Sequence, residues 1–197
     1  MEPITTIAGP VSVLDRADVD TDQIIPKQFL KRIERTGYGE FLFFDWMKQD
    51  GFELRRPEFE GAKILLAGRN FGCGSSREHA AWALQDYGFD VVIAPSFGDI
   101  FRTNSLKIGL LPVALPADEV RALMGAVAGG GELTVDLELQ QVVRPGGRAV
   151  RFELEPFARD CLLQGLDDIA LTLTHEAAIA DFERGHEAPI ATTALVS

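Results

Sequence analysis

A glycine-rich stretch, residues 68–79, carries residue types suited to holding an anion. It reads Gly-Arg-Asn-Phe-Gly-Cys-Gly-Ser-Ser-Arg-Glu-His, after an apolar run at 63–67 typical of a buried strand and before apolar residues at helical spacing. Glycines let the backbone approach a ligand closely, and the first N–H groups of a helix lack partners within the helix. With the guanidinium of Arg77, these groups predict a site for a carboxylate or a phosphate.

The same stretch also has a purely structural interpretation. Ser75 could cap the helix, with Glu78 completing a capping box and Arg77 solvated. The two interpretations are compatible, because a pair of serines, Ser75 and Ser76, offers one hydroxyl to the helix and leaves the other free. Cys73 fits a small loop-filling residue better than a nucleophile, since no histidine-rich neighbourhood accompanies it.

A second segment with chemical potential lies nearer the N-terminus, over residues 19–32. Two acids, Asp20 and Asp22, flank a threonine, and basic residues follow Pro26. In a functional interpretation a carboxylate orients a catalytic group while lysine and arginine meet an anionic substrate. Composition alone favours the simpler alternative, a surface turn with a solvated basic face.

Composition narrows the possible partners. The chain has 197 residues, 46% of them hydrophobic, which is enough for one well-buried core or for one domain with appendages, and we expect a single domain. Its net charge is −11 and no basic cluster occurs, so nucleic acid and anionic membranes are improbable partners. The N-terminus lacks the features of a signal peptide, and we expect a cytoplasmic protein. Cys73 and Cys161 lie too far apart in sequence for a metal-ligand spacing or a disulfide framework.

The elements that must position these residues follow an α/β pattern, with a β-rich layer after the α/β part. The expected elements are a helix at 76–87, a strand at 90–94, a turn at 95–99 that opens a segment at 100–108, a strand at 110–115, a helix at 116–128, strands at 133–137 and 149–153, short helices over 156–184, and a flexible tail at 188–197. Aromatic residues concentrate at 38–52, a density usual for a core but also suited to a partner surface. We expect residues 31–52 to be mobile or partner-facing, because Gly37, Gly39 and a cluster of charges surround them.

Three ordered motifs closely resemble the aconitase superfamily, and within it the small subunits of 3-isopropylmalate dehydratases. They are Asp-Thr-Asp-Gln-Ile-Ile-Pro at 20–26, Gly-Cys-Gly-Ser-Ser-Arg-Glu-His-Ala at 72–80 and Ile-Phe-Arg-Thr-Asn-Ser-Leu-Lys at 100–107. The resemblance continues to residues 166–173. It implies one domain over residues 1–197, the swivelling β/β/α domain in three layers, with additional C-terminal helices and supplied as a separate polypeptide.

The resemblance also implies a partner and a reaction. A large subunit would carry the cysteine ligands of a 4Fe-4S cluster, so that this chain itself binds no cofactor or metal and forms a heterodimer or a larger hetero-oligomer. The substrate would be a small dicarboxylate. Only the assembled hydro-lyase would convert 2-isopropylmalate into 3-isopropylmalate through isopropylmaleate, in leucine biosynthesis.

Family roles can be carried over to matching positions. By resemblance, Ser75 is the catalytic base as an alkoxide, stabilised by Arg77 and by the helix N-terminal amides, and Asp22 orients active-site groups. The remaining candidates are expected to contact substrate or line the cleft: Ser76 binds a carboxylate or assists the oxyanion pocket, Thr103 and Asn104 support the cleft, and Phe29, Leu30, Lys31 and Arg32 meet the isopropyl group or its carboxylate.

Two alternatives stay open. The nearer one is a small subunit of a related dehydratase acting on homoaconitate, citraconate, maleate or dimethylmalate, since one methylene changes binding by only about 1–3 kcal/mol. The more distant one is a non-catalytic anion-binding or regulatory module. A dinucleotide site is disfavoured, because Gly72-Cys73-Gly74 is not followed by a third glycine at the required spacing.

Overall fold

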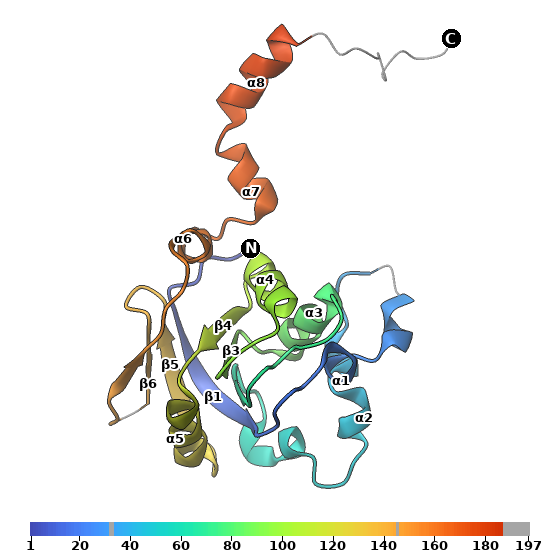
Figure 1. Cartoon of the computed structure of the whole chain (residues 1–197), viewed down its shortest axis with the longest axis vertical. Helices are drawn as coiled ribbons and strands as arrows, with labels where there is room; N and C mark the ends of the chain where they lie inside the picture. Colours follow the sequence, from blue (N-terminus) through green and yellow to red (C-terminus); the bar gives the residue numbers. More distant parts are fainter. Residues whose placement is uncertain (32–33, 145, 187–197) are drawn as a thin grey trace.

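A curled, mixed sheet of seven strands runs through the body of the protein in the order β4-β3-β2-β1-β5-β6-β7. The computed structural model describes residues 1–31, 34–144 and 146–186 (Figure 1). The strands are β1 (Thr6–Leu14), β2 (Ile64–Ala67), β3 (Val91–Ala94), β4 (Leu111–Ala114), β5 (Glu132–Asp136), β6 (Gln141–Val143) and β7 (Ala149–Arg151).

Strand β1 belongs to both halves of the sheet. Its C-terminal half pairs in parallel with β2, from Val11 opposite Ile64 onward, while its N-terminal half pairs antiparallel with β5. Strands β2, β3 and β4 are parallel, and β5, β6 and β7 form an antiparallel meander. β2 and β3 are buried throughout, which explains their continuous apolar sequences.

The helical elements include short turns before β2 and longer helices between the parallel strands. They are α1 (Thr21–Ile24), η1 (Lys27–Lys31), η2 (Gly39–Phe41), α2 (Phe44–Met47), η3 (Glu53–Arg55), η4 (Pro57–Phe59), α3 (Glu78–Tyr87), α4 (Asp99–Ile108), α5 (Ala117–Val127), α6 (Pro156–Gln164), α7 (Asp168–Leu173) and α8 (Glu176–Gly185). None of the helices in the described part of the chain combines the length and apolar character needed to cross a membrane.

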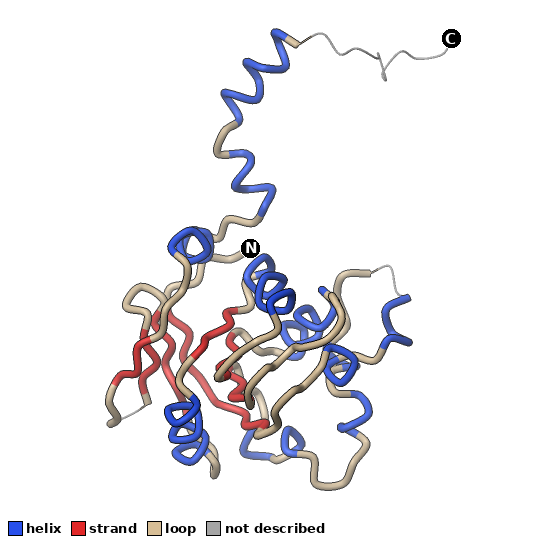
Figure 2. Tube along the Cα trace, in the orientation of Figure 1, coloured by secondary structure: helices blue, strands red, loops and turns tan. Residues whose placement is uncertain are grey.

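Two hydrophobic cores lie on the two faces of the parallel strands. Along β3, Val92 joins the core under α1 and α3, whereas Ile93 joins the core facing β5, β6 and α5. The result is three layers, helices, parallel strands and antiparallel strands, which are visible in Figure 2. The predicted α/β class and the β/β/α layering are confirmed.

The described part of the segment expected to be mobile, residues 34–52, packs into the helical layer. Tyr38, Leu42 and Phe43 are buried, and the Tyr38 backbone N–H donates to Asp86 Oδ2 at 2.8 Å. A side chain at Gly39 would lie 2.7 Å from the α3 backbone. The aromatic cluster therefore contributes to the core, and the mobility of the segment in solution stays a prediction.

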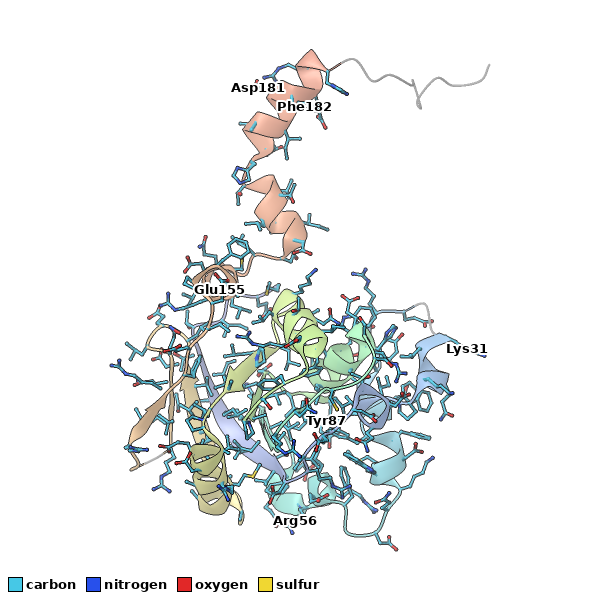
Figure 3. All side chains as sticks on the ribbon, in the orientation of Figure 1. Lys31, Arg56, Tyr87, Glu155, Asp181 and Phe182 are labelled. Carbon is cyan, nitrogen blue, oxygen red and sulfur yellow. The ribbon has the colours of Figure 1, made fainter. Side chains whose placement is uncertain are left out.

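Helices α7 and α8 project from the body as an arm (Figures 1 and 3). α8 buries no residue, and Phe182 on it is 65% exposed. The additional C-terminal helices expected from the sequence are thus present. α6 packs on the body through the buried Leu162, α7 contacts it through the Lys107–Asp168 pair, and α8 projects beyond it. The expected tail at 188–197 lies outside the described residues.

Candidate active site

Three loops meet at the carboxyl edge of the parallel strands, the usual ligand-binding edge of such sheets. They follow β1, β2 and β3, and the glycine-rich loop after β2 lies between the other two. The Gly72 N–H donates to the Val19 carbonyl at 2.7 Å, and the Thr21 N–H donates to the Cys73 carbonyl at 3.0 Å. On the other side, the Gly98 N–H donates to the Phe71 carbonyl at 2.9 Å. These bonds fix the loop to both neighbours.

Gly72 is required by both backbone conformation and space. Its φ is +73°, a left-handed value that favours glycine, and a side chain there would overlap the ring of Phe101 on α4. The loop and α4 can approach closely only because this position has no Cβ.

We expect Gly72→Ala to destabilise the protein by about 1–3 kcal/mol more than Gly51→Ala does, through overpacking against Phe101. Gly51 has a φ of +78°, and a Cβ added there would meet no described atom within 4 Å, so this position shares the conformational cost but not the clash. Urea unfolding of both variants measures the difference. Equal losses of stability would contradict the proposed contact.

The two serines follow the glycines and are both exposed. Helix α3 begins at Glu78 with Arg77 at the N-cap position and without a side-chain cap, so the capping box considered for Ser75 and Glu78 does not form. The buried Thr21 hydroxyl instead donates to the Ser75 carbonyl at 3.0 Å. The loop after β1 thereby holds the Ser75 backbone and leaves its hydroxyl uncommitted to the helix cap.

Arg77 and Asp22 form an ion pair between Nη1 and Oδ1. The Arg77 side chain is only 13% exposed, whereas that of Asp22 is 51% exposed. Nη1, the buried nitrogen of this pair, has the Asp22 carboxylate as its partner. A guanidinium carries five N–H groups, so the pair leaves others for a ligand. Contact with Arg77 is the main reason why the pKa of Asp22 lies below its ordinary value, with partial burial opposing and Lys27 adding to the effect.

The Asp22 carboxyl is therefore expected to titrate with a pKa below its ordinary value of 3.8 in the folded protein, and this pKa is expected to move upward in Arg77→Gln. The ionised form is favoured by folding, so the stabilisation is present above the pKa of the unfolded chain and is lost as pH falls through the lower folded pKa. Carboxyl NMR titration of both proteins measures it. An Asp22 pKa that is the same in the wild type and in Arg77→Gln would contradict the pairing.

The other predicted residues are distributed more widely. Thr103 on α4 donates its hydroxyl to the Asp99 carbonyl at 3.0 Å and lines a cavity of about 200 Å³ with residues of α6 and α7. Thr103 thus faces those helices, away from the glycine-rich loop, while Asn104 is half-buried on the same helix.

The substrate-reading candidates lie on η1, at the far edge of the helical layer. Phe29 stacks on Phe41 with ring centroids 4.1 Å apart, and Leu30 packs against the helical core. Lys31 is exposed at this outer edge, as Figure 3 shows. Arg32 lies outside the described residues.

Cys73 and Cys161 are free thiols. Burial, with Asp20 and Asp18 nearby, raises the pKa of the Cys73 thiol, which agrees with a loop-filling role and disfavours a thiolate nucleophile. Among the described residues, no group of three or more His, Cys, Asp or Glu side chains is arranged to hold a metal ion.

Some supporting residues were missed from the sequence. Thr21 was noted only as the residue between two acids, and Lys27 only as a nearby basic residue, although the Lys27 backbone N–H and charge reach Asp22. Asp18 and Asn70 adopt left-handed φ values of 56° and 57° beside the site. The sequence could have indicated these two positions, because Asp and Asn are the residues other than glycine that most readily adopt this conformation.

Comparisons with known proteins agree with one another. The family model for the aconitase C-terminal domain matches residues 1–118, and a model described as LeuD_N matches 121–156. A third model, for the C-terminal domain of the 3-isopropylmalate dehydratase small subunit, matches 168–188. Together they span the sheet, the site loops and the arm.

Individual relatives cover nearly the whole chain. A protein of Geobacillus sp. (strain WCH70), named 3-isopropylmalate dehydratase small subunit, is 54% identical over 94% of this chain and 98% of its own length. Its namesake from Bacillus subtilis (strain 168) is 52% identical over 93% and 96%. A crystal structure of 3-isopropylmalate dehydratase (leuD) from Methanocaldococcus jannaschii is 27% identical, with a TM-score of 0.68 over 89% of this chain and 98% of that one.

Proposed function

Because the chain belongs to the small-subunit family of 3-isopropylmalate dehydratase, we propose that it supplies half of the active site of this hydro-lyase. The assembled enzyme interconverts 2-isopropylmalate and 3-isopropylmalate through isopropylmaleate, a step of leucine biosynthesis in the cytoplasm. The observation that carries the proposal is an exposed serine pair next to an arginine whose side chain is only 13% exposed and is paired with Asp22.

Ser75 is the proposed base. Removal of a proton alpha to a carboxylate needs a strong base, and a serine hydroxyl becomes one only if its alkoxide is stabilised. Arg77 lies two residues away at the start of α3 and supplies positive charge there, together with the helix N-terminus. Asp22 holds the guanidinium in a fixed direction through the ion pair and is a positioning residue.

The substrate is a dianion, and the chain as a whole carries a net charge of −11. Attraction must therefore be local. Arg77 and Lys27 both lie beside Asp22 and provide such a patch, and the exposed hydroxyl of Ser76 is available to a substrate carboxylate.

A second protein must complete the site. Charge stabilisation of an alkoxide is effective where water is excluded, but Ser75 and Ser76 are exposed in this chain. Its described residues also offer no ligand set for a cluster. We assign both functions to the large subunit, whose 4Fe-4S cluster would provide the Lewis acid for the departing hydroxyl.

The test is the ultraviolet absorbance of isopropylmaleate formed anaerobically from 3-isopropylmalate. Activity is expected only when this chain is mixed with a cluster-loaded large subunit, and not with either protein alone. No activity in a mixture that associates and holds an intact cluster would overturn the isopropylmalate assignment. The same mixture would then be assayed with citraconate, maleate, homoaconitate and dimethylmalate. Tight dicarboxylate binding by this chain alone, without turnover in any mixture, would instead indicate a non-catalytic anion-binding module.

A further inference from the structure

We propose that Asp18, Arg69 and Asn70 form a clasp that holds the serine loop in register with Asp22, and that Asp18 and Asn70 are positioning residues of the reaction. The inference rests on the proposed function for its kinetic consequence. The clasp itself is formed entirely by residues of this chain and does not depend on the large subunit.

The clasp joins the loop after β1 to the loop after β2 through side chains and backbone. Asp18 accepts from Asn70 Nδ2 at 2.9 Å through Oδ1 and from Arg69 Nη2 at 2.9 Å through Oδ2. The Asp18 backbone N–H donates to the Arg69 carbonyl at 2.9 Å. Asn70 is anchored in turn on the third loop, because its N–H donates to Ser96 Oγ at 2.9 Å.

Both partners have unusual backbone conformations. Asp18 has a φ of 56° and Asn70 a φ of 57°, in the left-handed region that side chains other than those of Asn and Asp rarely adopt. The two residues lie in different loops and are joined by the hydrogen bond from Asn70 Nδ2 to Asp18 Oδ1. Strained conformations of this kind persist where surrounding contacts hold them, and they concentrate at functional sites.

Further hydrogen bonds between the same two loops lead from the clasp to the proposed catalytic groups. Above it, the Gly72 and Cys73 N–H groups both donate to the Val19 carbonyl, at 2.7 and 3.2 Å. Farther along the loops, the Thr21 N–H donates to the Cys73 carbonyl and the Thr21 hydroxyl donates to the Ser75 carbonyl. These hydrogen bonds connect successive residues of the two loops. The alignment of the loops at Asp18 and Asn70 therefore sets where Ser75 lies relative to Asp22.

The clasp is poorly placed to serve stability. The Arg69 and Asp18 side chains are 66% and 48% exposed, and exposed ion pairs contribute little to folding. Loss of the clasp is therefore expected to change loop geometry more than the free energy of unfolding. A small displacement of a reacting group is sufficient to lower turnover strongly.

Three variants test the clasp. Asn70→Gly keeps a backbone that tolerates positive φ and removes the amide, whereas Asn70→Asp places a carboxylate against Asp18. The double variant Asp18→Asn with Asn70→Asp restores an amide-to-carboxylate bond with the roles exchanged. Asp181→Asn, which breaks the exposed Asp181–Arg184 pair on α8, is the matched control.

Each variant is assayed in the complex with the large subunit, and amide exchange of Thr21, Gly72 and Cys73 is measured in the full-length chain alone. Both single variants are expected to lose about 10- to 100-fold in kcat with little change in KM, and to exchange these amides faster without an equal fall in Tm. The double variant is expected to recover most of the kcat, and the control to match the wild type.

Wild-type kcat in both single variants would overturn the clasp, as would a double variant no more active than Asn70→Asp. If the wild-type complex proves inactive, the proposed function fails separately and the exchange data decide. Unchanged protection of the three amides in Asn70→Gly would then overturn the clasp, and lost protection with a retained Tm would support it.

Discussion

Replacing Ser75 with alanine is expected to lower kcat of the assembled enzyme by about 10²–10⁴-fold, the range for loss of a positioned general base. Ser75 is exposed and does not cap α3, so the substitution removes the reacting hydroxyl without opening a cavity or freeing a helix end. KM should change much less, because Arg77 and Lys27 still attract the dianion. Initial rates of isopropylmaleate formation measure the effect.

A suitable control deletes a hydroxyl far from the site. Thr172 on α7 is exposed, and Thr172→Ala should leave turnover unchanged. The Tm of Ser75→Ala and its affinity for the large subunit should equal those of the wild type. A Ser75→Ala complex with turnover within about threefold of wild type would remove Ser75 from the role of base, since general bases contribute far more than this.

The second large effect is expected for Arg77→Lys, with kcat/KM falling by about 10²–10³-fold, as when one preorganised donor to an oxyanion is removed. Lysine keeps the charge but loses the planar fork, so it cannot hold the Asp22 carboxylate and still aim a second donor at a ligand. The buried Nη1, which contacts Asp22, has no counterpart in lysine. Steady-state kinetics of the complex provide the measurement.

Arg184→Lys is the matched control for this substitution. Arg184 also pairs with an aspartate, Asp181, but both are exposed on α8, where Figure 3 marks Asp181 at the far end of the arm. The control should retain full activity and stability. If Arg77→Lys behaves like Arg184→Lys, positive charge alone is sufficient at position 77, and the directional role proposed for the guanidinium is wrong.

The sequence by itself determined the class of fold and the local content of the site. Apolar runs interrupted by helical periodicity predicted buried strands alternating with helices, because strands that are buried on both faces of a sheet have continuous apolar sequences. The order of the three motifs indicated the family, and adjacency along the chain put Ser75, Ser76 and Arg77 in one loop. These features depend on residues that are close in the sequence, so they can be recognised without knowledge of the tertiary structure.

The tertiary structure alone decided which distant groups meet. Asp22 reaches Arg77, and Thr21 reaches Ser75, because β1 and β2 are parallel neighbours whose carboxyl ends open at the same edge. The sequence motif grouped Thr103 with the site, yet packing turns it elsewhere. Phe101 packs on Gly72, and a residue two positions later on a helix points to nearly the opposite side.

The first residue of α3 and the clasp could not be predicted from the sequence either. Ser75 had the chemistry of a cap, but Thr21 at the start of α1 donates hydrogen bonds to the Cys73 and Ser75 carbonyls, and α3 begins only at Glu78. Left-handed φ values at Asp18 and Asn70 arise from contacts between two loops far apart in the chain. Local sequence specifies which conformations a residue tolerates, whereas long-range packing selects the one it adopts.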